Sequence, residues 1–188
     1  MSSAPAGLWP PAATPFNDEG NVDYGRLARH CRALLDDGAN GLAVLGTTSE
    51  ANSLGIDERR RVVDSLIEAG VEPAKLMPGT GACAIPDAVA LTRHAAQVGA
   101  KAVLLLPPFY YKNATDEGLY AFVARLIEKA GADVPPIMLY HIPQMATFGW
   151  SQELIARLRE AYPEVVVGLK DSSGSAEHTI GLIDAFPG

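Results

Sequence analysis

The stretch Val165-Val166-Val167-Gly168-Leu169-Lys170-Asp171-Ser172-Ser173-Gly174 carries the most information about this 188-residue chain. It reads as a short aliphatic strand, with no polar side chain before Lys170, followed by a turn of serine and glycine. Because side chains alternate along a strand, we expect Val166, Gly168 and Lys170 to share one face. A lysine is seldom buried without a reason, and an amine shielded from water is a nucleophile towards ketones. The alternative is that Lys170 simply reaches solvent or pairs with Asp171.

Outward from this strand, the chain repeats a unit of apolar run, turn and amphipathic segment. The apolar runs predict six strands, at Leu8–Pro15, Gly41–Gly46, Lys75–Gly79, Ala102–Pro107, Pro136–Ile142 and Val165–Lys170. The segments between and after them predict six helices, at Asp23–Asp36, Asp57–Ala69, Pro86–Val98, Thr115–Gly131, 151–162 and Ser175–Ala185. Such alternation indicates parallel strands joined by right-handed crossovers.

Two architectures share this alternation: an open doubly wound sheet and a closed (β/α)₈ barrel. The open sheet would be complete with six strands. A barrel typically takes about 250 residues, so this chain would supply about six of its eight β/α units. The pattern alone does not choose between the two.

Composition restricts the class of protein and the kinds of partner. With 48% hydrophobic and 20% charged residues, the chain is typical of one soluble globular domain. The net charge of −7, without a basic stripe, argues against nucleic-acid and membrane partners. No signal peptide or membrane span is evident, and Cys31 and Cys83 form no CxxC pair, so we expect a cytoplasmic protein with reduced thiols.

Motifs for metals and cofactors are weak. The four histidines show no metal-ligand spacing, so no metal is expected. Gly79-Thr80-Gly81-Ala82-Cys83-Ala84 matches a dinucleotide fingerprint, but the next predicted strand ends in prolines rather than an acidic residue. No cofactor is therefore expected.

Two further stretches carry candidate chemistry. Tyr140 ends the strand before that of Lys170, where its phenol could act as a general acid or base at the same mouth. Gly46-Thr47-Thr48-Ser49-Glu50 follows the second strand, where a glycine turn with two hydroxyls could hold a carboxylate. The structural alternatives are a tyrosine packed at a rim and an ordinary loop that caps a helix.

Taken together, these segments resemble the dihydrodipicolinate synthase / N-acetylneuraminate lyase superfamily of class I aldolases. The resemblance covers essentially the whole chain and keeps the family's motif order. The matching motifs are Thr14-Pro15-Phe16, Gly46-Thr47-Thr48-Ser49-Glu50, Pro107-Pro108-Phe109-Tyr110-Tyr111, Tyr140-His141-Ile142-Pro143 and Gly168-Leu169-Lys170-Asp171-Ser172-Ser173-Gly174.

This resemblance implies a single (β/α)₈-barrel domain over residues 1–188 that is incomplete at its C-terminal end. It implies that Lys170 forms a Schiff base with pyruvate or a related 2-keto acid and that Tyr140 moves protons. Thr47 would serve both catalysis and substrate binding, with Gly46 and Thr48 beside it on the substrate carboxylate. Tyr111 would enter the relay from a neighbouring subunit, which implies a homo-oligomer, either a dimer or a tetramer.

The expected function is therefore that of a Schiff-base-forming lyase that takes a 2-keto acid together with an aldehyde or sugar-acid co-substrate. Two departures matter: Ser49 stands where the family usually has glycine, and no cation follows the tyrosine motif, where lysine-pathway enzymes carry an arginine and this chain has Gln144-Met145-Ala146. The departures favour an aldolase or dehydratase of sugar-acid or hydroxyproline catabolism over 4-hydroxy-tetrahydrodipicolinate synthesis. A metal-dependent aldolase and a non-catalytic keto-acid-binding regulator remain alternatives.

Overall fold

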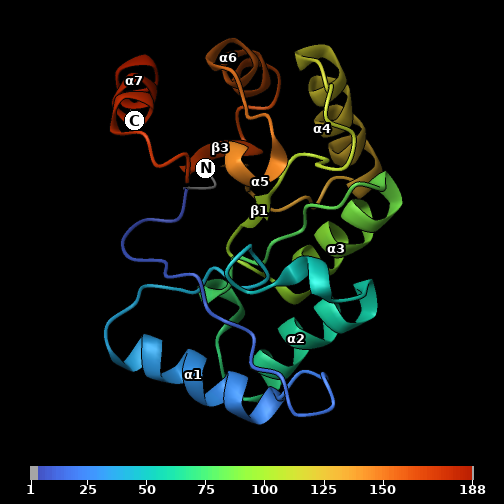
Figure 1. The fold of residues 1–188 in the computed structure, drawn as a ribbon, viewed down its shortest axis with the longest axis vertical. Helices are drawn as coiled ribbons and strands as arrows, with labels where there is room; N and C mark the ends of the chain where they lie inside the picture. The colour runs from blue at the N-terminus through green and yellow to red at the C-terminus, as the bar shows by residue number, and fades with distance from the viewer. Residues whose placement is uncertain (1–3, 188) are drawn as a thin grey trace.

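The computed structural model describes residues 4–187, in which strand segments alternate with helices (Figure 1). The expected domain also takes in residues 1–3 and 188, which lie outside the described residues. The strands are β1 (Val103–Leu105), β2 (Ile137–His141) and β3 (Val166–Asp171). The α-helices are α1 (Tyr24–Asp36), α2 (Ile56–Glu68), α3 (Ile85–Val98), α4 (Asp116–Ala130), α5 (Pro143–Ala146), α6 (Gln152–Ala161) and α7 (Ala176–Ala185), with short 3₁₀ turns at Ala51–Ser53 and Pro73–Lys75.

Six parallel segments lie side by side in chain order. The strands β1, β2 and β3 pair in parallel, in that order. The three earlier predicted strands are present only as isolated parallel bridges, Pro11 to Ala43, Leu42 to Leu76 and Gly79 to Leu104. The prediction of six full strands is therefore wrong for the first three. Prolines 10, 11 and 78 lack the N–H that a continuous ladder needs, which explains the short pairing.

The helix starts follow the capping residues in the sequence. Asp23, Thr115, Ser151 and Ser175 each accept a hydrogen bond from the backbone N–H three residues later, so α1, α4, α6 and α7 start where those caps predict. Helix α2 begins at Ile56 instead of Asp57, with the Glu58 side chain accepting from the Gly55 N–H. The four-residue α5, directly after the tyrosine motif, is absent from the predicted elements.

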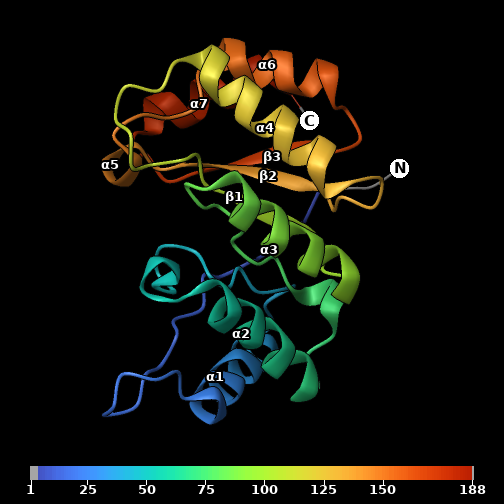
Figure 2. The same cartoon turned by 90° about the vertical axis from the view of Figure 1, so that its right-hand side faces the viewer.

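The two faces of the strand segments have different partners. On the inner face, Tyr140 packs in a cluster whose members all come from strand segments or their ends: Ala43, Met77, Ala102, Leu104 and Tyr140, with Trp9, Leu106, Met138 and Ile142 against them. On the outer face, β1–β3 share a core with α3, α4 and α6 (Figure 2). In Figure 1 the long helices accordingly form an arc from α1 to α7 around the strands.

This arrangement decides between the two architectures. A doubly wound sheet carries helices on both faces, whereas here, within residues 4–187, the inner cluster consists of side chains from the strand segments and their ends. The chain therefore forms six consecutive β/α units of a (β/α)₈ barrel, as its motifs predict. None of the helices within residues 4–187 combines the length and the apolarity needed to cross a membrane.

An irregularity in β3 corrects one prediction about the faces. Ile137 pairs with Val166 and Met138 pairs with Gly168, so Val167 is an extra residue at this point. Val166 therefore belongs to the outer core with Ile137, not to the face of Lys170. The predicted alternation holds only from Gly168 onward.

Candidate active site

Lys170 and Tyr140 lie opposite each other on neighbouring strands. The register of β2 and β3 pairs Tyr140 with Lys170, near the C-terminal end of both strands. This is the end at which (β/α)₈ barrels carry their catalytic groups. Both side chains face the barrel interior, as predicted from the strand order and from the alternation after Gly168.

The contacts among these side chains are direct. Lys170 Nζ lies 4.0 Å from the centre of the Tyr140 ring. The Tyr140 hydroxyl donates to Thr47 Oγ1 at 3.3 Å, across 93 positions of sequence. Only 4% of Tyr140 is exposed, and Lys170 is half-buried. An amine, a phenol and a hydroxyl from three segments thus meet in a sheltered space.

The surroundings of Tyr140 change the acidity of its phenol. Burial raises the pKa, but the hydrogen bond with Thr47, the positive charge of Lys170, and hydrogen bonds with Lys170 and Ser172 lower it. The net result is a Tyr140 pKa below the ordinary value. A phenol tuned in this direction gives up its proton more readily near neutral pH.

The loop that carries Thr47 has an unusual backbone. Leu45 and Glu50, on either side of it, have positive φ of 57° and 53°. Such conformations are uncommon for non-glycine residues and are typical of functional turns. Within the loop, Thr47 is half-buried, whereas Thr48 is exposed. Of the two predicted threonines, the structure brings only Thr47 to Tyr140.

Ser49 has a structural role that explains its departure from the family's glycine. Its side chain is fully buried, and its hydroxyl donates to the Ala12 carbonyl at 2.5 Å. This bond ties the Thr47 loop to the first strand segment, where Ala12 also donates its N–H to the Ala43 carbonyl. The serine therefore holds the loop and makes no contact with the reactive groups.

Arg59 was missed by the sequence reasoning. This α2 side chain is 4% exposed and lines the same small cavity as Thr47 and Tyr140. Its guanidinium donates to the Gly79 carbonyl at 2.8 Å and to the Gly81 carbonyl at 3.2 Å. Burial lowers the Arg59 pKa to about 10, although the charge of Asp87 opposes this shift. Nothing in the run Arg59-Arg60-Arg61 indicates which arginine turns inward.

The glycines of the apparent dinucleotide fingerprint serve close packing between segments. A Cβ on Gly79 would lie 2.0 Å from the Leu45 carbonyl oxygen, and a Cβ on Gly81 would lie 2.6 Å from Leu106 Cβ. Both positions require glycine for that reason. The match to the fingerprint is thus explained without a nucleotide.

Two residues singled out in the sequence lie away from this cluster. Tyr111 is 79% exposed and packs edge-to-face on Tyr110, with the ring centres 5.2 Å apart. Met145, in the stretch after the tyrosine motif that lacks a cation, is 57% exposed on α5. The neighbouring Gln144 side chain donates to the Ser173 carbonyl and so joins the loops that follow β2 and β3.

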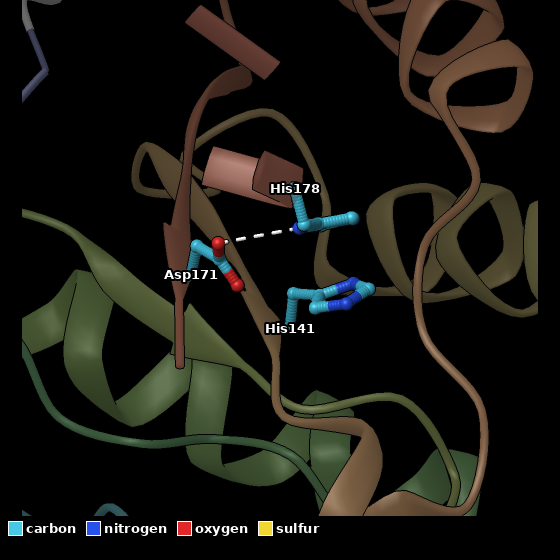
Figure 3. A group of neighbouring side chains, drawn as sticks. All are labelled: His141, Asp171 and His178. Carbon is cyan, nitrogen blue, oxygen red and sulfur yellow. Dashed lines mark hydrogen bonds and ion pairs between the residues drawn. The ribbon is translucent and has the colours of Figure 1, made fainter. Parts of the chain in front are cut away.

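A second cluster lies on the outer side of the same two strands (Figure 3). His141 and Asp171 follow Tyr140 and Lys170, and the sheet register pairs them with each other. His178, on α7, contacts Asp171 through Nδ1 at 3.2 Å and stacks on His141, with the ring centres 4.3 Å apart and the planes at 21°. One nitrogen or oxygen atom from each of the three residues lies within 4.8 Å of the others.

This cluster does not fit a metal ion. A metal binds in the plane of an imidazole ring, and two nearly parallel rings cannot both direct a lone pair at one ion. His141 Nδ1 also accepts a hydrogen bond from the Trp150 N–H at 3.1 Å. The proton of the neutral ring then sits on Nε2 and blocks that nitrogen as a ligand. Burial, together with electrostatic repulsion between the two histidines, lowers the His141 pKa, although Asp171 opposes this shift, so the neutral ring of His141 is favoured.

Comparisons with known proteins agree with this fold. The model of the Dihydrodipicolinate synthetase family matches residues 4–186. An uncharacterized DapA-like lyase of Chloroflexus aurantiacus is 39% identical over 97% of the chain and 61% of its own length. The crystal structure of dihydrodipicolinate synthase from Agrobacterium tumefaciens is 38% identical, with a TM-score of 0.92 over 95% of this chain and 62% of that one.

A structure with a bound ligand is also similar. The chloride-inhibited dihydrodipicolinate synthase of Acinetobacter baumannii, complexed with pyruvate, is 32% identical, with a TM-score of 0.85 over 95% of this chain and 60% of that one. The chain thus spans about three-fifths of the length of these relatives. The match along nearly every residue of this sequence shows that the chain belongs to the dihydrodipicolinate synthetase family.

Proposed function

We propose that this protein is a class I lyase that binds a 2-keto acid, such as pyruvate, as a Schiff base on Lys170. The observation that carries the proposal is the contact of the Lys170 amine with Tyr140, whose hydroxyl in turn contacts Thr47. Such a site needs a nucleophilic amine and a group that moves protons beside it. The pyruvate complex of the related Acinetobacter baumannii enzyme supports this class of substrate.

Lys170, Tyr140 and Thr47 each have a separate role in the formation of the Schiff base. The neutral amine of Lys170 attacks the keto carbon, a C–N bond forms, and the former carbonyl oxygen leaves as water after it gains protons. Tyr140 supplies and recovers these protons, because its phenol adjoins the amine and has a lowered pKa. Thr47 orients the phenol, and the turn at Gly46, Thr47 and Thr48 holds the substrate carboxylate.

Borohydride reduction in the presence of pyruvate tests the Schiff base. We expect a stable adduct that peptide mapping locates on Lys170, and we expect Lys170→Met to remove it. Lys112→Met is the matched control, because Lys112 is an exposed lysine whose Nζ donates to the nearby Phe109 carbonyl. An intact wild-type Lys170 after reduction would reject the class I mechanism. Pyruvate binding without any turnover would favour a keto-acid-binding regulator.

We further propose that the second substrate is not that of the lysine pathway. The exposed Met145 offers no positive charge at the mouth, and Gln144 beside it is bonded to Ser173. A second carboxylate without a cation loses stabilisation of about 2–5 kcal/mol. A panel of aldehydes with pyruvate tests this: slow turnover of aspartate semialdehyde relative to an uncharged or sugar-acid aldehyde is expected, and efficient condensation would contradict it.

The proposal includes a neighbouring copy of the chain. Tyr110 and Tyr111 are 69% and 79% exposed, and prolines 107 and 108 stiffen the start of their loop. We propose that Tyr111 reaches the Tyr140 relay of another subunit. Tyr111→Phe should then lower turnover less than Tyr140→Phe does, and light scattering should find a dimer or tetramer.

A further inference from the structure

The outer cluster of Figure 3 lies directly behind the proposed reactive pair. Along β2 and β3, Tyr140 and Lys170 face the barrel interior. The next residues, His141 and Asp171, lie on the other side, beside His178 of α7 (Figure 3). Each outer residue is thus one peptide bond from a reactive one. Any group that holds the outer residues also limits where the inner side chains can lie.

Asp171 is the centre of this outer network. Only 8% of its side chain is exposed. Its carboxylate accepts from the Ser173 N–H at 2.9 Å, the Ser173 hydroxyl at 3.1 Å and the Thr179 hydroxyl at 2.6 Å, in addition to its contact with His178 Nδ1. Burial raises the Asp171 pKa, but these hydrogen bonds more than offset it and leave the pKa well below its usual range.

The other side of the network fixes Tyr140. The Trp150 indole N–H donates to the Tyr140 carbonyl at 3.0 Å, and its backbone N–H donates to His141 Nδ1. Gly149 lies against the His141 ring so closely that an added Cβ would be 2.1 Å from it. The His141 ring is therefore held in a tight socket, and His178 stacks on its open face.

One residue connects the network to the interior. Ser172 lies between Asp171 and Ser173, whose N–H and hydroxyl both donate to the Asp171 carboxylate. The Ser172 N–H donates to the His141 carbonyl at 2.8 Å, and its hydroxyl reaches Tyr140. The turn that Asp171 holds together thus places a hydroxyl against the phenol.

We propose that Asp171 is a positioning residue, which uses its contacts with Thr179 and His178 to hold the turn after β3 so that Lys170 and Ser172 meet Tyr140. This inference rests on the proposed function for the identity of the reactive pair. It adds that α7, through its first turn, takes part in setting the geometry of that pair from outside the barrel.

Two variants test the network, and each is compared with wild type and with Thr92→Val. Asp171→Asn removes the charge and one acceptor, and Thr179→Val removes one donor without changing any charge. Thr92 is a suitable control, because its hydroxyl is fully buried on α3 and has no hydrogen-bond partner among the described residues. Thermal unfolding establishes that each variant is folded, and Thr179→Val serves alone if Asp171→Asn does not fold.

The first measurement does not depend on activity. The phenol of Tyr140 is titrated by ultraviolet absorbance, as the difference between each protein and the same protein with Tyr140→Phe. We expect Thr179→Val, which changes no charge, to raise the pKa of Tyr140 by about 0.5, because contacts that lower it become looser. In Asp171→Asn the loss of a negative charge opposes this rise, so the shift should be smaller. Thr92→Val should leave the pKa of Tyr140 unchanged. A Tyr140 titration that is the same in all four proteins overturns the positioning role, whatever their activity.

The second measurement uses the Schiff base. If borohydride traps pyruvate on Lys170 of wild type, it should trap pyruvate on Asp171→Asn and on Thr179→Val about 10-fold more slowly. The pyruvate concentration for half-maximal trapping should change by less than about twofold, because the carboxylate turn at Thr47 is untouched. If wild type traps no pyruvate, the proposed function fails, and the phenol titration alone decides the role of Asp171. Wild-type trapping rates in both variants overturn the positioning role while the proposed function stands.

Discussion

The Lys170 amine lies over the face of the Tyr140 ring, 4.0 Å from its centre, although 30 positions separate the two residues in the chain. The parallel pairing of β2 and β3 creates this contact, since it sets the two residues opposite each other. An imine nitrogen formed on Lys170 would lie beside the phenol. The relationship therefore makes Tyr140 the first residue to test for proton transfer.

Removal of the Tyr140 hydroxyl should affect chemistry more than binding. We expect Tyr140→Phe to lower kcat by about 10²-fold or more, because the phenylalanine fills the same space without the transferable proton. Steady-state kinetics with the best substrate of the aldehyde panel gives kcat and KM separately. A kcat close to that of wild type would show that another group moves the protons, and Lys170 could still form its Schiff base.

Loss of the Thr47 hydroxyl should move the pH dependence. The hydrogen bond with Thr47 lowers the pKa of Tyr140, so Thr47→Val should raise that pKa. If the deprotonated phenol is the base, the rising limb of the rate profile moves to higher pH, and activity near pH 7 falls by about 3- to 10-fold. Rates measured from pH 6 to pH 10 should converge at the alkaline end. A limb that stays in place would contradict the role assigned to Thr47.

Acid stability should depend on Asp171. Its pKa is depressed in the folded protein, so the carboxylate stabilises the fold above the pKa of the unfolded chain, roughly 4. This contribution is lost as the pH falls towards the lower folded value. Urea unfolding of wild type should therefore lose more free energy between pH 6 and pH 3 than that of Asp171→Asn. If wild type and Asp171→Asn lose the same free energy of unfolding, the hydrogen bonds of Asp171 contribute little to acid stability.

Gly79 should tolerate no side chain. A Cβ there would lie 2.0 Å from the Leu45 carbonyl oxygen, which is backbone and has little freedom to move. We expect Gly79→Ala to cost more than about 3 kcal/mol of unfolding free energy. Gly25→Ala is the matched control in helix α1, where the nearest atoms are 3.4 Å or more away, and it should be neutral or stabilising by up to about 1 kcal/mol. Similar effects of the two changes in a urea titration would contradict the close approach.

Zinc should not bind specifically at His141, Asp171 and His178. The stacked rings and the hydrogen bond from Trp150 occupy the imidazoles in a geometry that a metal cannot use. Calorimetric titration with ZnCl₂ should give the same affinity, within about twofold, for wild type and His178→Ala. Tight stoichiometric binding that disappears in His178→Ala would show that the rings reorient to form a metal site.

The sequence predicts the alternating topology and the meeting of Lys170 with Tyr140, because strand order and side-chain alternation depend on the pattern of residues. The sequence is less informative within a run of one residue type, because it does not show which member of the run has a different environment. Three consecutive valines, 165–167, do not reveal which one is extra in the ladder. Likewise, Arg59 has the same side chain as its exposed neighbours Arg60 and Arg61, so its burial depends on packing that no local pattern encodes.

The outer network was missed for a related reason. His141 and His178 lie 37 positions apart without metal-like spacing, and Asp171 beside a candidate lysine suggested an ion pair. In the structure Asp171 is directed to the opposite side of β3, towards Thr179 and His178. The third predicted strand was overestimated because Pro78 interrupts the hydrogen bonding of the short run Lys75–Gly79.

The extra residue at Val167 has a consequence for how this segment can vary during evolution. Its deletion would leave Val166 opposite Ile137 and Gly168 opposite Met138, so the strand would alternate regularly and Lys170 would stay opposite Tyr140 inside the barrel. By contrast, the loss of one residue between Gly168 and Lys170, where the ladder is regular, would turn Lys170 towards the helices and place Asp171 inside the barrel. Selection should therefore conserve the spacing from Gly168 to Lys170 strictly, whereas it can tolerate the loss of the extra residue at Val167.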